Sequence, residues 1–453
     1  MQNQVDVFNF RQSAAVLVCA LAFAAPARSA DLLQIFRDAR ANDAAYASAR
    51  AALEAGREKL PQGKALLLPT INLTGNSTYN EVDSRLRSGL TAGQWFNRPF
   101  NSNGYTLTLS QPLYRMQNWT QYEQAEFQVA QSEAVFGQAS QDLILRVSQV
   151  YFDVLASQDS LATIQAQKAA IAEQLAQARR NFEVGTATIT DTHEAQARFD
   201  LSTSQEIAAQ NDLEFKQRAL QQLIGRYPES LAKLKPKLQL SPPQPAVMET
   251  WTESAQRQNY AVRVQEAGFE IASREVKRSR AGHLPTLDVV GTYGTTSAGN
   301  SAASGIGSDQ KFTTIGLQFA VPIYSGGGVN SRIREAIASQ DKSRADLENS
   351  RRQAALAARQ SYLGVTNGMA QVRALEQALL SSETALASNK LGYEVGVRIN
   401  IDVLNSQQQV FSTQRDLSKA RYDTLLNGLR LKAAAGTLSE ADLEEVNRLL
   451  GSD

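Results

Sequence analysis

One pattern occurs twice in this sequence, and the two copies lie about 211 residues apart. The copies share landmarks in the same order: Tyr151 and Tyr362, Val184-Gly185 and Val395-Gly396, Asp191 and Asp402, Gly225 and Gly436, and, one residue closer together, Pro112-Leu113-Tyr114 and Pro322-Ile323-Tyr324. An internal repeat constrains a fold more strongly than a local motif, because each copy must form the same supersecondary unit. The sequence therefore predicts one unit built twice, over residues 30–225 and 248–436. A Pro-rich linker at 226–247 joins the copies, and residues 437–453 form a separate C-terminal segment.

Residues 1–29 have the composition of a secretory signal peptide. Arg11 precedes an apolar stretch at 14–25, and proline and small residues follow it. We expect cleavage near Ser29; the alternative is an N-terminal core helix. Cys19 is the only cysteine in the chain and lies inside this stretch. The mature protein would therefore contain no disulfide, no thiol nucleophile and no lipid anchor.

The composition gives little support to an enzyme, a metal site or a cofactor site. The two histidines, His193 and His283, are far apart in sequence, and neither an HExxH motif nor a phosphate-binding loop is present. The run Gly326-Gly327-Gly328 lacks the lysine of a phosphate loop, and we interpret it as a turn into a long helix. A formal net charge of +1 implies no general attraction to nucleic acid. After residue 30 there is no apolar run long enough to predict a membrane-spanning helix.

Each copy begins with strand signals. A predicted helix over residues 32–67 ends near Pro69, and apolar and polar residues then alternate at 70–74 and 105–110, separated by a polar stretch. The second copy repeats the alternation at 287–293 and 314–319. Lightly hydrophobic strands with one apolar face suit a transmembrane barrel. Two ordinary soluble hairpins are the alternative.

Long helices follow the strands. Apolar residues recur at alternating spacings of four and three between Leu143 and Phe182, which is a coiled-coil seam. Residues 114–184 contain no proline, and a continuous helix of that length would extend on the order of 100 Å, far beyond a membrane about 30 Å thick. We expect Gly185 and Gly396 to end these helices, because glycine readily adopts the left-handed conformation found there. Returning helices begin near Asp191 and Asp402, so each copy predicts an antiparallel helical hairpin.

Four strands cannot close a barrel, and open strand edges are not stable in lipid. The smallest sound barrels have about eight strands, so the chain must associate with further copies. Two copies would supply eight strands and three would supply twelve. An aqueous lumen favours three or more copies.

The most specific stretches of the sequence are 393–405, Ala420-Arg421-Tyr422-Asp423, 436–440, 181–185 with 189–191, Leu68-Pro69 and 111–114. Through these segments the sequence resembles the TolC family of outer-membrane channel proteins over essentially the whole mature chain. The resemblance implies a mainly α fold with β strands, in which antiparallel helical hairpins of a homotrimer form an α-barrel and four strands per chain form a shared 12-stranded transmembrane β-barrel. Residues 437–453 would be an equatorial segment. The duct would be anchored in outer-membrane lipid and would extend into the periplasm.

The resemblance also implies partners and functional residues. A periplasmic adaptor (membrane fusion) protein and an inner-membrane transporter of the ABC, RND or MFS type would engage the periplasmic end and open it by untwisting an inner coil. The implied gate network is Thr190 and Asp191 with Tyr393 and Arg398, the entrance constriction is Asp402 and Asn405, and the adaptor-docking positions are Val184, Gly185, Val395 and Gly396. The family has aspartate at both constriction positions, so Asn405 predicts an entrance less selective for cations.

Several alternatives remain open at this stage. Asp191 and Asp402 suit helix N-termini whatever their function, and Tyr393 also continues the heptad row. The chain could instead be a trimeric structural or surface coiled-coil protein with a barrel anchor, or a soluble helical scaffold. The preferred function is an outer-membrane exit duct for type I protein secretion, multidrug efflux or both, with a slight preference for secretion; the sequence does not name the cargo.

Overall fold

The computed structural model describes residues 30–85, 87–89, 92–228, 230–235, 240–301 and 306–451. The predicted signal peptide lies outside these residues. The chain forms two compact units. We call Met1–Ser48, Gln138–Asn259 and Gln353–Asp453 the helical unit, and Ala49–Gly137 and Tyr260–Arg352 the strand unit. Each is described separately.

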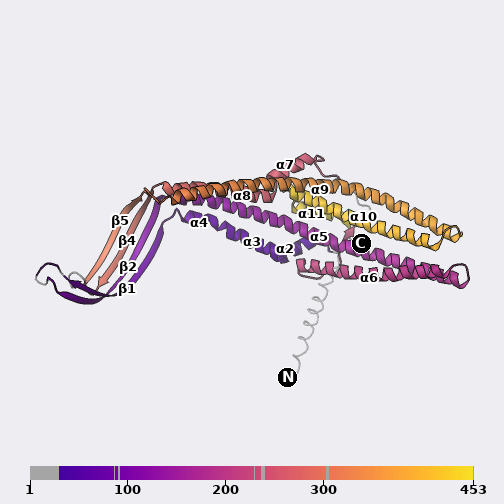
Figure 1. The fold of residues 1–453 in the computed structure, drawn as a ribbon, viewed down its shortest axis with the longest axis horizontal. Helices are drawn as coiled ribbons and strands as arrows, with labels where there is room; N and C mark the ends of the chain where they lie inside the picture. The colour runs from indigo at the N-terminus through magenta and orange to yellow at the C-terminus, as the bar shows by residue number, and fades with distance from the viewer. Residues whose placement is uncertain are drawn as a thin grey trace, which may run out of the picture. The chain divides into compact units, whose positions relative to one another are not determined.

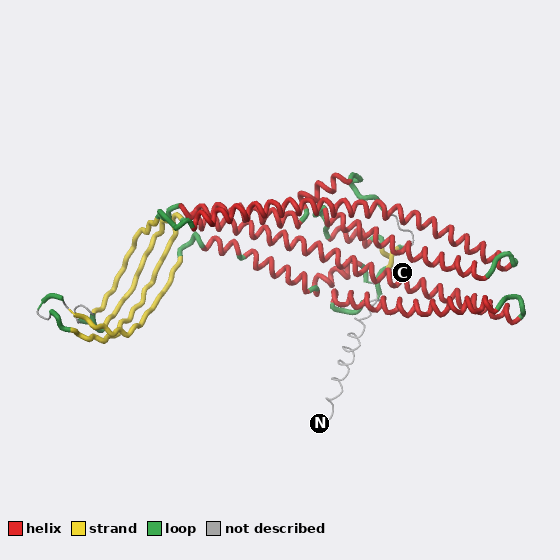
Figure 2. The backbone as a smooth tube through the Cα atoms, in the orientation of Figure 1, coloured by secondary structure: helices red, strands yellow, loops and turns green. Residues whose placement is uncertain are grey.

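The elements follow the duplicated order that the repeat predicts (Figure 1). The first half contains α2 (Leu32–Asn42), α3 (Ala44–Arg57), α4 (Lys59–Ala65), β1 (Thr70–Arg85), β2 (Trp95–Tyr114), α5 (Met116–Glu183), α6 (Ile189–Ile224) and the short β3 (Lys233–Leu234). The second half contains α7 (Met248–Gln258), α8 (Tyr260–Arg280), η1 (Ala281–His283), β4 (Thr286–Ala298), β5 (Ser308–Ala320), α9 (Gly328–Glu394), α10 (Asn400–Ala434), α11 (Glu440–Asn447) and β6 (Leu450–Gly451). Figure 2 shows β1, β2, β4 and β5 gathered in one sheet and the remainder mainly helical, while the short β3 and β6 pair with each other.

The strand unit contains one antiparallel sheet in the order β1-β2-β4-β5. The pairing of β1 with β2 runs from Thr70 opposite Ser110 to Arg85 opposite Trp95. The sequence showed strand alternation only at 70–74 and 105–110, with a polar stretch between them, and the strands continue through much of that stretch. Residues such as Asn76 are typical of turns, but the ladder of backbone hydrogen bonds keeps them in the strand.

The long helices have nearly the predicted bounds. Helix α5 comprises 68 residues and α9 comprises 67, and both lack internal proline. The predicted heptad seam is buried along much of α5, for example at Leu143, Val154 and Ile171. Phe182 was assigned to the same seam, but 44% of its surface is exposed. It lies in the last turn of α5, where the helices separate into the hairpin turn.

The core of the helical unit lies where α2, α5, α6, α10 and α11 meet. Tyr151 of α5 is fully buried, and its phenol donates to the carbonyl of Ala232 at 2.7 Å. Helix α11 begins with the predicted capping box, in which Asp442 accepts from the amide of Ser439 at 2.7 Å. Leu443 and Val446 of this helix are buried in the core. The short C-terminal helix is therefore part of the packed structure.

None of the helices in the described ranges is long and apolar enough to cross a membrane.

Candidate functional site: the hairpin tips and the strand sheet

The turn between α5 and α6 has a defined backbone motif. The amide of Thr186 donates to the carbonyl of Asn181 at 2.8 Å, and the amide of Gly185 donates to the carbonyl of Phe182 at 3.0 Å. Gly185 has φ of 79°, the left-handed conformation in which a side chain would be strained. This is a Schellman C-cap, as the glycine predicted.

The turn between α9 and α10 repeats this motif. Val397 donates to the carbonyl of Gly392 at 2.9 Å, Gly396 donates to Tyr393 at 3.1 Å, and φ of Gly396 is again 79°. Val184 and Val395 precede the two glycines and are 73% and 65% exposed. In one chain, both tips therefore present a valine to solvent.

Thr190 and Asp191, the first half of the predicted gate network, lie in the first turn of α6, and Asp191 already has hydrogen-bond partners there. Asp191 accepts from the amide of Thr188 at 3.0 Å and from its hydroxyl at 2.8 Å, and this reciprocal capping box begins α6. Thr190 is exposed in the first turn of α6. Within a single chain, Asp191 therefore acts as a helix-capping residue, which is the alternative role that the sequence left open.

The second half of that network also finds partners within one chain. The phenol of Tyr393 accepts from Nδ2 of Asn181 at 3.2 Å, and Arg398 lies 3.6 Å from the carboxylate of Asp402. Within the described residues, the structure brings neither Tyr393 nor Arg398 into hydrogen bonding with Thr190 or Asp191. The network that the family resemblance implies stays a prediction about the assembled protein.

The predicted entrance positions lie in the first turns of α10. Asp402 is partly exposed and Asn405 is exposed. Asn405 accepts through Oδ1 from Nη2 of Arg198 at 2.7 Å, and Arg198 also donates to Gln408. Sequence reasoning missed Arg198, although it follows Asp191 by seven residues and so lies on the same face of α6. This arginine joins the first hairpin to the second.

Buried amides also join the hairpins, on the side of α5. Nε2 of Gln174 donates to Oδ1 of Asn400 at 2.8 Å, and both side chains are more than 90% buried. Seven residues farther from the tip on each helix lie Gln167 and Gln407, which are also buried. Leu404 packs in an apolar cluster between these two levels. The seam therefore alternates polar and apolar layers, which in coiled coils fixes register at a cost in stability.

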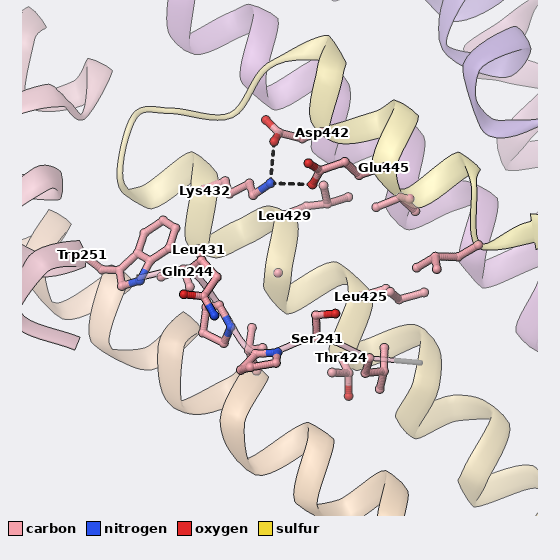
Figure 3. A pocket seen from close by; sticks show the side chains of 17 residues that line it. Ser241, Gln244, Trp251, Thr424, Leu425, Leu429, Leu431, Lys432, Asp442 and Glu445 are labelled. Atoms are coloured by element: carbon pink, nitrogen blue, oxygen red, sulfur yellow. Dashed lines mark hydrogen bonds and ion pairs between the residues drawn. The ribbon is translucent and has the colours of Figure 1, made fainter. Parts of the chain in front are cut away.

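A cavity of about 620 Å³ lies beside α10 and α11, bordered by the Pro-rich linker (Figure 3). Trp251 and Leu429 form part of its wall. Nζ of Lys432 lies 2.6 Å from the carboxylate of Asp442 and 3.0 Å from that of Glu445. Burial alone would lower the pKa of Lys432, but the hydrogen bonds to the two carboxylates outweigh it and raise the pKa. The cation therefore helps to fasten α11 to α10.

The sheet of the strand unit has one apolar and one polar face. In one row across it, Leu73 lies opposite Leu107, and Leu107 lies opposite Tyr293. All three side chains are at least 40% exposed. The adjacent row is polar: Asn72, Thr108, Thr292 and Thr314. An exposed apolar face beside a polar one is the side-chain arrangement of a strand between lipid and water.

An ion pair lies at the end of the sheet where β2 is followed by α5. Nε and Nη2 of Arg115, between β2 and α5, lie 2.8 and 2.6 Å from the two carboxylate oxygens of Asp288 on β4. Asp288 is 3% exposed. A bidentate pair of this kind fixes orientation as well as distance, so it sets how β2 leads into the long helix.

Comparison with known sequences and structures agrees with this geometry. The sequence pattern that defines the family described as "Outer membrane efflux protein" matches residues 35–226 and 251–437. The chain is 33% identical to the outer membrane protein TolC of Vibrio cholerae, with 92% of this chain and 93% of the relative covered. It is 32% identical to the proteases secretion protein PrtF of Dickeya chrysanthemi, with 96% and 95% covered.

Among solved structures, the outer membrane protein VceC of Vibrio cholerae has the same fold. The TM-score is 0.76 at 18% sequence identity, and the match covers 89% of this chain and 96% of that one.

Proposed function

The chain belongs to the outer membrane efflux protein family, and we propose that three copies of it form the gated exit duct of a tripartite export system. It is an outer-membrane protein that extends into the periplasm, and it serves as an exit duct for secretion or efflux rather than as an enzyme. The assembly, the gate and the partners are the parts we propose. The two repeats, 30–225 and 248–436, are the structural units in this proposal.

One observation carries the proposed assembly: the described sheet ends in two unpaired edges, β1 and β5. Its apolar face includes exposed Leu73 on β1 and exposed Leu317 on β5. Open edges cannot stay in lipid, because each unpaired backbone group there costs several kcal/mol. Strand direction alternates across the sheet, so β5 of one copy would run antiparallel to β1 of the next. Three copies then close a ring of twelve strands.

The two hairpin tips support the proposed partners. The exposed valines and the paired Schellman turns offer matching surfaces on α5–α6 and α9–α10, on which a periplasmic adaptor would dock. Tyr393 and Arg398, released from Asn181 and Asp402, would bond to Thr190 and Asp191 and keep the inner coil closed. Opening would follow when the adaptor and an inner-membrane transporter of the ABC, RND or MFS type engage the tips.

The cargo includes secreted protein in this proposal, since PrtF is named for protease secretion. A deletion strain that still exports its large secreted substrates would remove this element and leave small-molecule efflux.

Conductance of the purified mature protein in planar bilayers tests the duct itself. We expect discrete single channels of small, mostly closed conductance, and a trimer that resists mild SDS until it is heated. Protein that forms an SDS-resistant trimer without conducting would favour the structural or surface-protein alternative.

A further inference from the structure

Arg198 is held against the predicted entrance by two hydrogen bonds from one guanidinium. Nη2 donates to Asn405 at 2.7 Å, and Nη1 donates to Gln408. The two acceptors are three residues apart on α10 and therefore share a face of that helix. Guanidinium carries five donors in a rigid fork and stays charged at any pH the protein meets. The side chain is thus a fixed positive charge at the level of Asn405.

The neighbouring entrance position also has an arginine beside it. Arg398 lies 3.6 Å from Asp402, and both side chains are partly exposed to water. Among the described residues, the charged groups at the two entrance positions are the carboxylate of Asp402 and the guanidinium groups of Arg398 and Arg198. In an open duct, in which Arg398 is not bonded to Thr190 and Asp191, each chain therefore contributes a net charge of +1 there, where two unpaired aspartates would contribute −2.

We propose that Arg198 makes the entrance of the duct favour anions over cations, so that anionic cargo is the class it passes most readily. This inference rests on the proposed function, because it needs Asn405 to line the passage of an assembled duct. Charges act across about 8 Å of physiological saline. A cation one hydrogen bond from Asn405 therefore acts on any ion that passes that side chain. A narrow passage lined by one sign of charge also concentrates ions of the other sign.

The test is the reversal potential of single channels under a KCl gradient. We expect the wild-type protein to pass chloride in preference to potassium. Arg198→Gln should raise the potassium-to-chloride permeability ratio at least about twofold, because it removes the charge and retains a polar side chain. Arg198→Lys keeps the charge and should keep the wild-type preference. Asn405→Asp should raise the same ratio without removing the arginine.

Arg218→Gln is the matched control. Arg218 lies on the same helix and bonds to Glu214 and Gln221, but it is 20 residues from Arg198, roughly 30 Å along the helix. The inference is overturned if Arg198→Gln leaves the ratio unchanged, or if Arg218→Gln changes it equally. It is also overturned if wild-type channels prefer potassium. A wild-type trimer that does not conduct would instead reject the proposed function, and the inference with it. If Arg198→Gln does not assemble, the wild-type reversal potential decides the question: a chloride preference supports the inference and a potassium preference overturns it.

Discussion

The phenol of Tyr422 on α10 donates a 2.7 Å hydrogen bond to Oδ2 of Asp159 on α5, inside the helical unit. Burial raises the pKa of the Asp159 carboxyl, and the bond from Tyr422, with the charges of Lys233 and Arg421, opposes this without cancelling it. Burial also raises the pKa of Tyr422, so its phenol remains a donor. The pair joins the two hairpins through a carboxylate that is costly to ionise.

The first prediction concerns Asp159 and pH. Because its pKa is higher in the folded state than in the unfolded one, its ionised form lowers stability at neutral pH, and this cost fades as the pH falls through the raised pKa. We expect Asp159→Asn to unfold at a higher temperature than wild type at pH 7, since the amide oxygen still accepts from Tyr422. The difference should shrink toward about pH 4.

Thermal unfolding in detergent, followed by helix content across this range, measures the effect. Asp200→Asn, which changes an exposed carboxylate on α6, is the control. A wild-type protein more stable than Asp159→Asn at pH 7 would contradict the prediction.

The second prediction uses the two faces of β2. Leu107 belongs to the apolar row and Thr108, the next residue, belongs to the polar row. Arginine on a lipid-facing position near the membrane midplane costs about 2–4 kcal/mol, whereas a position facing water tolerates it. We expect Leu107→Arg to reduce the amount of assembled protein in the outer membrane, and Thr108→Arg to leave that amount near wild type. Quantified heat-modifiable bands from membrane fractions distinguish them; equal losses would mean that the faces are wrongly assigned.

The third prediction concerns the proposed gate. Tyr393→Phe combined with Arg398→Ser removes the phenol and the guanidinium that, in the proposed gate, would donate to Thr190 and Asp191, so the mostly closed conductance should rise several-fold. Single-channel recording measures this change. Asn181→Ala is the informative control, because it removes only the bond from Asn181 to Tyr393. If Asn181→Ala alone opens the channel as much as the double variant does, the bond between Asn181 and Tyr393 keeps the channel closed. Thr190 and Asp191 would then have no part in the gate.

The fourth prediction concerns Arg115 and Asp288. Removing one partner of a fully buried pair costs about 3–5 kcal/mol, because a charge is left without compensation. Arg115 is 44% exposed, so we expect a smaller loss, about 2 kcal/mol, in Arg115→Met. The double variant Arg115→Met, Asp288→Leu should recover most of it. Chemical unfolding of the three proteins gives these values, and a double variant as unstable as the single one would contradict the compensation.

Local chemistry made much of this fold predictable. Gly185 and Gly396 predicted the ends of α5 and α9, because few other residues adopt the left-handed backbone conformation without strain. The strand extension through Asn76 was not predictable in the same way. Its residues favour turns, and only pairing with β2 across the sheet keeps them extended. Strand pairing joins segments distant in sequence, and local propensity does not report it.

In the candidate site, too, features set by local sequence were predictable, and contacts between distant segments were not. The sequence identified Asp402 and Asn405, and the structure places them together in the first turns of α10. The contacts of Arg198 with Asn405, and of Gln174 with Asn400, join residues more than 200 positions apart. Those contacts depend on how the hairpins pack, so only the folded chain reveals them.

The first strand hairpin is longer than the second, and in the proposed duct this difference would mark the end that faces the cell exterior. Residues 95–100 of β2 have ladder pairing with β1 alone, beyond Ser102 opposite Ala298 and beyond Asn101, whose carbonyl accepts from the amide of Gly299 at 2.9 Å. At about 3.3 Å per residue, the ribbon continues for roughly 20 Å past its neighbours. In the proposed orientation, three such ribbons would stand clear of the lipid around each exit. Antibodies raised against the peptide around Trp95 would then stain intact living bacteria, and the protein could be counted on a cell without breaking it open.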